Sequence, residues 1–359
     1  MRQDKNNINH RKPNTQLYNI PFKIEEFNDM PFRALGSSGL KVPNVGLGTW
    51  KMGYPESGDG SRINEKDAFQ IFDKAIEYGV TFWDTANRYN SASGNSERVI
   101  GAWLNNHPDQ RRNVVLATKL GGAMDGLTPN HWGLSRANIM DSVYASLDRL
   151  QVNYIDLLYF HLFDPLCPID ESLMAIEDLI QQDLVRYFAV SNFTIDQLDA
   201  YKSVENNFSV RSRIVAVQNQ FDILNGERAP YEGVLEHAFQ RGISFIAWSP
   251  LAKGLLTEKY LDVDNVGSGD RLFDEGEIKK DSNIAGADIL HELASLSKEW
   301  GLKLNQLAIF YMLTLPGMGP VIQASSNVEQ LESNAMAGKI ILGDGQKQQI
   351  KAIITPDIR

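Results

Sequence analysis

The feature that most constrains the fold is a repeated alternation of short apolar segments and longer amphipathic ones. Apolar runs rich in β-branched residues begin near eight positions, Val45, Val80, Val114, Ile155, Arg186, Ile214, Ile243 and Pro320. The intervals between them are 35, 34, 41, 31, 28, 29 and 77 residues. Most of these intervals have the length of one strand, one helix and two loops. Eight such units predict an α/β fold, a closed (β/α)₈ TIM barrel.

The local patterns agree with parallel strands that are covered by helices. Runs such as IDLLYF and ISFIAW are apolar at nearly every position, as strands buried on both faces should be. Apolar residues recur at helical spacing from Ile139 to Leu150, after Ser135, a residue type that caps helices. Thr194 and Gln197 have the spacing of a capping box, which predicts another helix start.

Three segments depart from the repeat. FRALGSSGLKVPNVG, which starts at Phe32, holds a Ser-Ser-Gly turn between two extended pieces and predicts an N-terminal β-hairpin. The 77-residue interval contains a polar stretch, LDVDNVGSGDRLFDEGEIKKDSN, which is typical of a long rim loop over a binding site. Residues 1–30 are polar and lack periodicity. We therefore expect an N-terminal extension over residues 1–30 and a barrel domain over residues 31–359.

Composition argues against several classes of protein. The chain has 43% hydrophobic and 22% charged residues, which is typical of a soluble globular protein. It lacks an apolar run of membrane-spanning length and a recognisable signal peptide, so we expect a cytoplasmic location without membrane contact. A net charge of −10 with scattered Lys and Arg argues against a nucleic-acid partner. The six histidines are dispersed, so no metal site is expected.

Four polar residues follow three consecutive predicted strands. Asp84 follows VTFW and precedes Tyr89, Lys119 follows VVLAT, and His161 follows IDLLYF. Because strand ends of a parallel barrel meet on one face, we expect these side chains to lie together. A neighbouring Lys⁺ lowers the pKa of a tyrosine from about 10, and an aspartate would hold that lysine in place. A histidine could hydrogen-bond a substrate oxygen, which Tyr89 would protonate.

Each of the four residues also has a purely structural explanation. Asp84 could cap the following helix, and Tyr89 could serve only in packing. Lys119 could end a strand in solvent, and His161 could be a hydrogen-bonded core residue. Their joint occurrence at consecutive strand ends is what favours a catalytic role.

These motifs resemble those of the aldo-keto reductases, and the resemblance extends from about Phe32 to Asn334. GLGTW is similar to the first-strand motif of that family, and DTANRY matches its Asp-Thr-Ala-x-x-Tyr signature. The Thr-Lys pair and YIDLLYFH resemble its third-strand lysine and fourth-strand histidine. In that family Asp, Tyr, Lys and His form the catalytic tetrad, with Tyr as general acid. The resemblance implies these roles for Asp84, Tyr89, Lys119 and His161.

The resemblance also implies a nicotinamide cofactor and a small carbonyl or alcohol substrate. Ser191 and Asn192 are similar to the pair that holds the nicotinamide carboxamide, with Gln218 at the matching amide position. Trp248 resembles the aromatic residue that stacks on the nicotinamide. The other expected cofactor contacts are Gly48, Thr49, Trp50, Asp84, Ser249, Leu251, Lys253, Leu255, Ser325, Ser326, Gln330 and Asn334. Expected substrate contacts are Trp50, Tyr54, Tyr89, His161 and Trp132, although Trp132 could instead only brace its loop.

One stretch departs from the family pattern. Near the eighth strand the family often has Gly-Ala-Arg, whose arginine binds the 2′-phosphate of NADP(H). Here residues 321–327 read VIQASSN, and no cation lies around Ser326. Neutral hydrogen bonds are roughly half as strong as charge-assisted ones, although Lys253 could supply a charge from outside this stretch. We expect NADP(H) as the cofactor, with NAD(H) also accepted.

Two alternatives to an NAD(P)(H)-dependent oxidoreductase remain open. The family includes channel-associated β subunits and lens proteins, so a regulatory, non-catalytic cofactor-binding barrel is one alternative. The other is a Schiff-base aldolase with Lys119 as nucleophile, in which Ser191, Asn192 and Trp248 would be superfluous. The intact tetrad favours the oxidoreductase. The sequence predicts neither the substrate nor the oligomeric state.

Overall fold

The computed structural model describes residues 23–205, 212–262, 264, 266–268, 270–277, 287–341 and 343–355. Eight strands close into a parallel barrel in the order β10-β11-β4-β5-β6-β7-β8-β9. Their bounds are β4 (Val45–Gly48), β5 (Phe82–Asp84), β6 (Val115–Leu120), β7 (Ile155–Phe160), β8 (Val185–Ser191), β9 (Ile214–Gln220), β10 (Ser244–Trp248) and β11 (Met318–Gln323). The predicted (β/α)₈ barrel is confirmed.

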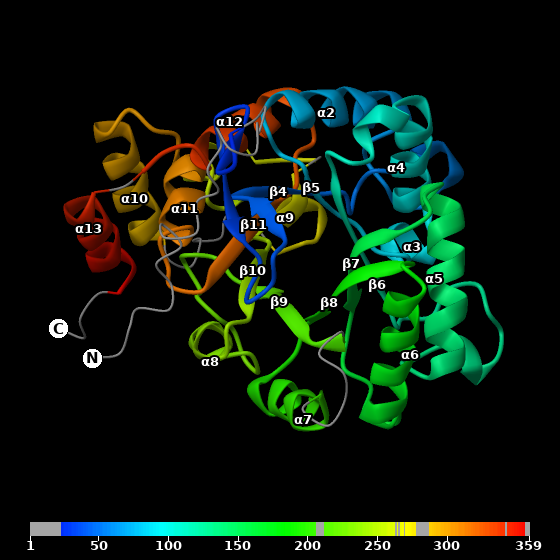
Figure 1. Ribbon diagram of the computed structural model, residues 1–359. Helices are drawn as coiled ribbons and strands as arrows, with labels where there is room; N and C mark the ends of the chain where they lie inside the picture. The colour runs from blue at the N-terminus through cyan, green and yellow to red at the C-terminus, as the bar shows by residue number, and fades with distance from the viewer. Residues whose placement is uncertain are drawn as a thin grey trace.

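Helices follow the strands and surround the barrel (Figure 1). The helix predicted after Ser135 is α5 (Arg136–Leu150), and the Ser135 side chain accepts a hydrogen bond from the Asn138 N–H. Thr194 and Gln197 form the predicted capping box, with N···O distances of 3.0 and 3.4 Å. The other helices are α2 (Glu65–Glu77), α3 (Tyr89–Ala92), α4 (Asn95–Asn106), α6 (Ile169–Gln181), α7 (Ile195–Glu205), α8 (Val234–Gln240), α9 (Arg271–Asp274), α10 (Ala287–Glu299), α11 (Leu304–Met312), α12 (Val328–Ala337) and α13 (Asp344–Ile354).

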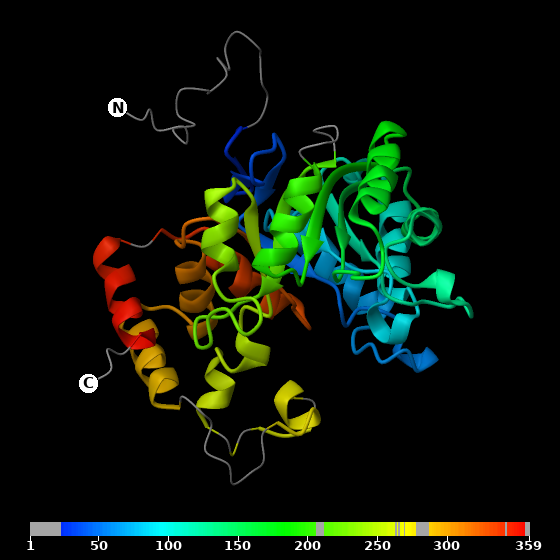
Figure 2. The ribbon, with the colours of Figure 1, turned by 90° about the horizontal axis from the view of Figure 1, so that it is seen from below.

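A small sheet precedes the barrel. Strands β2 (Met30–Ala34) and β3 (Lys41–Pro43) pair antiparallel, which confirms the predicted hairpin. Leu35 and Val42 of the hairpin belong to the same buried cluster as the residues of the barrel interior. Figure 2 shows the hairpin at one end of the barrel and the segment with α9 at the opposite end. The hairpin therefore covers the end that is remote from the long rim loop.

The predicted N-terminal extension falls mostly outside the described residues. Residues 1–22 are not among them. Close to the end of the predicted extension, β1 (Glu26–Phe27) pairs with β2, and Met30 is fully buried in the main hydrophobic cluster. The last residues of the segment 1–30 thus pack on the barrel.

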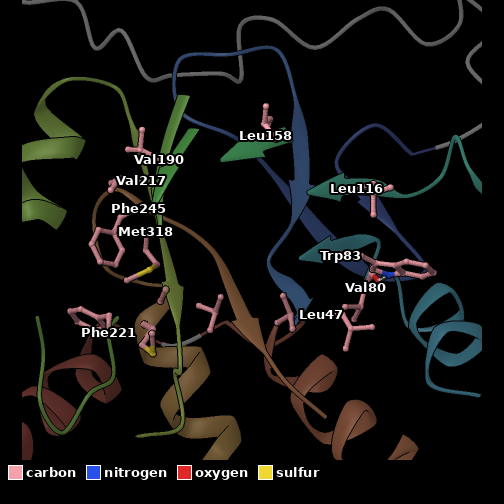
Figure 3. Close-up of a cluster of buried hydrophobic side chains, with 14 of the residues drawn as sticks. Leu47, Val80, Trp83, Leu116, Leu158, Val190, Val217, Phe221, Phe245 and Met318 are labelled. Atoms are coloured by element: carbon pink, nitrogen blue, oxygen red, sulfur yellow. Dashed lines mark hydrogen bonds between the residues drawn. The ribbon is translucent and has the colours of Figure 1, made fainter. Parts of the chain in front are cut away.

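Side chains alternate between two apolar clusters along each barrel strand. In β7, Leu158 belongs to the cluster packed against the helices, whereas Leu157 and Tyr159 belong to the cluster inside the barrel. Figure 3 shows the outer cluster, which includes Leu116 and Val190. A strand has a side-chain period of two, so each strand presents its last inward position at the rim. Inward positions at or near the carboxyl ends of the strands hold the predicted site residues Asp84, Lys119, Ser191, Gln218 and Trp248.

No helix in the described part of the chain is long and apolar enough to span a membrane. Among the same residues, no group of three or more His, Cys, Asp or Glu side chains is arranged to hold a metal ion.

Candidate active site

The four predicted catalytic side chains meet at the carboxyl ends of β5, β6 and β7. Lys119 Nζ donates hydrogen bonds to Asp84 Oδ1 at 2.5 Å, to Tyr89 Oη at 2.8 Å and to the Thr85 carbonyl at 3.0 Å. These acceptors use all three hydrogens of the ammonium group. The rings of Tyr89 and His161 lie edge to face with their centroids 6.0 Å apart. The structure thus brings together residues that are far apart in the chain.

Exposure divides the four residues into an inner and an outer pair. Asp84 and Lys119 are buried, with exposed fractions of 2% and 1%. Tyr89 and His161 are partly exposed. The inner pair is therefore shielded from water, while the two groups that would contact a substrate reach the open end of the barrel.

Asp84, Tyr89, Lys119 and His161 form the candidate catalytic relay. Burial and neighbouring charges set the protonation states of Lys119 and Tyr89. Burial lowers the pKa of Lys119, but the Asp84 carboxylate and the Tyr89 phenol together outweigh burial and raise it. Burial raises the pKa of Tyr89, and the charge of Lys119 offsets only part of that rise. Lys119 thus lowers the pKa of Tyr89, as the sequence predicts, but burial, which the sequence does not reveal, has the larger effect and raises it. At neutral pH Lys119 is charged and Tyr89 holds its proton.

His161 is a neutral ring at neutral pH. Burial, with smaller contributions from the charges of Lys119 and Arg88, lowers the pKa of His161 to about 3. Its Nδ1 atom is buried and makes no hydrogen bond with a described residue. The backbone N–H of His161 donates to the Leu120 carbonyl at 2.8 Å, which fixes the residue beside the end of β6.

Three predicted cofactor residues extend the same hydrogen-bond network. Gln218 Nε2 donates to Asp84 Oδ2 at 2.7 Å, so both carboxylate oxygens of Asp84 have partners. Ser191 Oγ donates to the Gln218 carbonyl at 3.0 Å. Asn192 Nδ2 donates to Ser191 Oγ at 3.1 Å and to the His161 carbonyl at 3.0 Å. The residues expected at the nicotinamide therefore adjoin the catalytic relay.

A cleft of about 520 Å³ lies beside the relay. It begins at Gly48, which pairs with Asp84 between β4 and β5. Nine predicted cofactor residues line it: Gly48, Trp50, Ser249, Leu251, Lys253, Ser325, Ser326, Gln330 and Asn334. The remaining ones do not line it: Thr49, Asp84, Ser191, Asn192, Gln218, Trp248 and Leu255. Thr49 is buried beneath the rim, where its hydroxyl bonds to Ser96 Oγ at 2.8 Å.

The cleft also contains basic residues that could not be placed there from the sequence. Lys259 and Arg271, from the long rim loop, line it together with Lys253. Lys253 Nζ lies 3.0 Å from Glu275 and also pairs with Glu277. Arg271 pairs with Glu275 at 2.9 Å, and Lys259 pairs with an aspartate of the same loop. No periodic pattern marks such loop residues, so only their charge in a long polar loop could have suggested them.

The predicted substrate contacts Trp50, Tyr54 and Trp132 lie in three different surroundings. Trp50 lines the cleft, between Lys51 Nζ at 4.1 Å and Arg271 Cζ at 4.6 Å from its ring centroid. Tyr54 donates its hydroxyl hydrogen to Glu65 of α2 at 2.7 Å. Trp132 is 47% exposed in the loop after β6. Within the described residues, neither Tyr54 nor Trp132 makes a hydrogen bond with the relay, so their contacts with substrate stay predictions.

Comparison with known proteins identifies the family. The family model described as Aldo/keto reductase family matches residues 44–355. The chain belongs to the aldo/keto reductase family. This aldo-keto reductase is 31% identical to Aldo-keto reductase AMT2 of Alternaria alternata, over 94% of this chain and 95% of that protein. It is also 31% identical to the uncharacterized oxidoreductase YqkF of Bacillus subtilis, over 85% and 90% of the two chains.

A third relative of this aldo-keto reductase has a different kind of name. The chain is 29% identical to a probable voltage-gated potassium channel subunit beta of Arabidopsis thaliana, over 87% of this chain and 92% of that protein. Membership of the family shows that the protein is an NAD(P)H-dependent oxidoreductase acting on small carbonyl or alcohol compounds.

The cleft of this aldo-keto reductase fits such a cofactor. Gln323, at the end of β11, lines the cleft, and its buried Nε2 has no hydrogen-bond acceptor among the described residues. A cofactor oxygen would satisfy this donor, since buried donors rarely stay unpaired. Lys253 and Arg271 bring positive charge to the same cleft, which suits a pyrophosphate.

Proposed function

We propose that the protein reduces a small carbonyl compound with NADPH and that Tyr89 is the general acid. The observation that carries the proposal is the ammonium group of Lys119, which joins Asp84 and Tyr89 in a buried network. The bound nicotinamide supplies the hydride. Tyr89 gives its proton to the carbonyl oxygen, and Lys119, 2.8 Å away, stabilises the phenolate that forms. In alcohol oxidation the phenolate takes up the proton again.

His161 orients the carbonyl oxygen in this proposal. Its ring is neutral, because its pKa is about 3. The buried Nδ1 has no partner among the described residues, and an unpaired buried N–H is rarer than an unpaired acceptor. We therefore place the proton on Nε2. This N–H can donate to the substrate oxygen beside Tyr89.

The cofactor residues follow from the network and the cleft. Ser191, Asn192 and Gln218 would hold the carboxamide next to the relay, and Trp248 would pack on the nicotinamide ring. NADPH is the preferred cofactor in this proposal because Lys253 and other basic residues line the cleft. NADH is also accepted, since Lys253 and Arg271 already have a carboxylate partner in Glu275. We further propose a cytoplasmic location, which cell fractionation would check.

Tyr89→Phe tests the proposed acid. The substitution keeps the ring and removes the only transferable proton, so the turnover of benzaldehyde with NADPH should fall at least about 100-fold. The affinity for NADPH, followed by tryptophan fluorescence, should stay within about twofold, because Tyr89 is not among the residues that line the cleft. Tyr144→Phe, at an exposed position on α5, is the matched control. Turnover by Tyr89→Phe close to that of the wild type would rule out this mechanism.

A non-catalytic, regulatory role is the second candidate. It is favoured by the relatives named as potassium channel β subunits, from Arabidopsis thaliana and Oryza sativa. A purely regulatory protein would bind NADPH and yet oxidise none of it with a panel of aldehydes and ketones. The Schiff-base alternative is disfavoured because Lys119 is charged and donates to three acceptors. Such an ammonium has no lone pair for attack on a carbonyl group.

A further inference from the structure

We propose that Arg88 binds a carboxylate group of the substrate, so that the enzyme prefers carbonyl compounds that also carry an acid. The inference rests on the proposed function, because it specifies the substrate class of the same site. Arg88 immediately precedes Tyr89 in the loop after β5.

The side chain of Arg88 extends across the rim to the loop after β6. A Cβ atom placed on Gly122 would lie 2.4 Å from Arg88 Cδ, 2.8 Å from Nη1 and 2.9 Å from Nε. Glycine at position 122 therefore leaves the space that the guanidinium occupies. Gly122 is two residues beyond Leu120, whose carbonyl holds the backbone N–H of His161. Arg88 thus lies on the part of the rim that carries Tyr89 and His161.

Arg88 has no counter-charge in the described part of the chain. It is exposed and makes no hydrogen bond or ion pair with a described residue through its guanidinium. The neighbouring carboxylate of Asp84 is fully engaged by Lys119 and Gln218. By contrast, Lys253 in the cleft is paired with glutamates of the rim loop. An unpaired arginine beside the proposed acid is notable in a chain with 45 acidic and 35 basic residues.

The surroundings favour a carboxylate on an apolar framework. A guanidinium matches a planar carboxylate with two parallel hydrogen bonds, which fixes the orientation of the ligand as well as its charge. Leu162, which follows His161, is 50% exposed. Trp132 is 47% exposed and precedes Gly133, whose N–H donates to the carbonyl of Gly121, the neighbour of Gly122. These apolar surfaces suit a ring or an alkyl chain between the carbonyl group and the acid. An aromatic aldehyde with a para carboxylate is therefore a suitable probe.

The kinetic test compares 4-carboxybenzaldehyde with its neutral methyl ester. The wild type should show a kcat/KM at least about tenfold higher for the acid, because the carboxylate forms one or more charge-assisted hydrogen bonds with Arg88. Most of the difference should lie in KM. Arg88→Met should reduce this ratio to about one. Gly122→Ala should reduce it partly, because the added methyl group displaces the guanidinium while the charge remains. Arg112→Met is the control, since it removes an exposed arginine before β6, at the other end of that strand.

A ratio near one in the wild type, or an unchanged ratio in Arg88→Met, would overturn the proposal. If the wild type reduces neither aldehyde, the proposed function fails, and calorimetric binding of 4-(hydroxymethyl)benzoate decides on Arg88 separately. Binding at least about tenfold tighter to the wild type than to Arg88→Met supports the carboxylate site. Equal affinities for both proteins, or binding no tighter than that of benzyl alcohol, refute it.

Discussion

Lys119 couples Asp84 to Tyr89 through one hydrogen bond to each, so its removal should change the pH dependence of the reaction as well as its rate. Lys119→Met keeps the length of the side chain and deletes the charge that lowers the pKa of Tyr89. The pKa of Tyr89 should then rise further. In the proposed mechanism Tyr89 accepts a proton during alcohol oxidation, so the rising limb of the pH–rate profile should move to higher pH. Oxidation at pH 8 should slow by about tenfold or more.

The measurement is the pH–rate profile of benzyl alcohol oxidation, from about pH 6 to 11. Lys66→Met, at an exposed position on α2, serves as the control for the loss of one positive charge. A profile of Lys119→Met that coincides with the wild-type profile would show that Lys119 is not coupled to the phenol.

His161 should make the folded protein sensitive to acid. Its pKa is about 3 in the folded protein, below the ordinary value of 6.5. Between these two values the unfolded chain binds a proton that the folded protein does not, so stability is lost as the pH falls below 6.5. At pH 5 the loss is about 2 kcal/mol. His161→Gln has no imidazole to protonate, so it should not lose this stability. Relative to the wild type, its free energy of unfolding should therefore rise by about 2 kcal/mol between pH 8 and pH 5.

Urea unfolding at the two pH values measures the difference. His131 is exposed, so His131→Gln is the control, and its loss of stability between pH 8 and pH 5 should equal that of the wild type. If the stabilities of His161→Gln and the wild type change in parallel with pH, the ring of His161 is not held neutral by burial.

Among the secondary-structure elements, the strands could be predicted and one turn could not. Each barrel strand begins within two residues of its expected position, because burial on both faces leaves a continuous apolar run in the sequence. No comparable sequence pattern predicts the turn after Tyr89. Asn90, Ser91 and Ala92 all have positive φ angles of 55°, 58° and 60°. Tertiary contacts impose this conformation, including a 2.7 Å hydrogen bond from Asn90 Nδ2 to the Met52 carbonyl.

The strain of this left-handed turn can be tested with one substitution at two positions. A left-handed conformation costs a non-glycine residue roughly 1–2 kcal/mol, whereas glycine in place of alanine costs about 1 kcal/mol inside a helix. Ala92→Gly should therefore leave the free energy of unfolding unchanged or raise it by up to about 1 kcal/mol. Ala145→Gly, at an exposed position inside α5, should lower it by about 1 kcal/mol. Equal destabilisation by both substitutions in urea would contradict strain at Ala92.

At the scale of the whole molecule, the site residues on the barrel strands could be predicted from the sequence, whereas those on the long rim loop could not. Asp84, Lys119 and Gln218 occupy inward positions at or near the carboxyl ends of their strands, so the strand pattern alone places them toward one rim. Lys259 and Arg271 reach the cleft through the 77-residue interval, whose path depends on tertiary contacts. The loop path also determines which cations have partners, and this bears on the choice of cofactor.

The preference for NADPH over NADH should be modest. Ser326 lines the cleft where the family often has an arginine, and its backbone N–H donates to Gln330 Oε1 at 2.8 Å. Lys253 and Arg271 are paired with Glu275, so a 2′-phosphate would have to compete with a carboxylate for them. We expect the ratio of kcat/KM for NADPH to that for NADH to lie below roughly a thousandfold, which corresponds to about 4 kcal/mol.

Ser326→Arg should shift this ratio toward NADPH, because it places an unpaired charge at the position where the family binds the 2′-phosphate. A charge-assisted hydrogen bond stabilises by roughly 1.5–3 kcal/mol, so a gain of about 1 kcal/mol, or about fivefold in the ratio, is a conservative expectation for an exposed residue. Ser326→Gln, which adds bulk and hydrogen-bonding capacity without charge, should shift the ratio by less than about twofold. Steady-state constants for both cofactors at low ionic strength provide the measurement, and added salt should reduce the gain, since screening weakens exposed charges. A wild-type preference above a thousandfold, or no shift in Ser326→Arg, would mean that the 2′-phosphate binds elsewhere in the cleft.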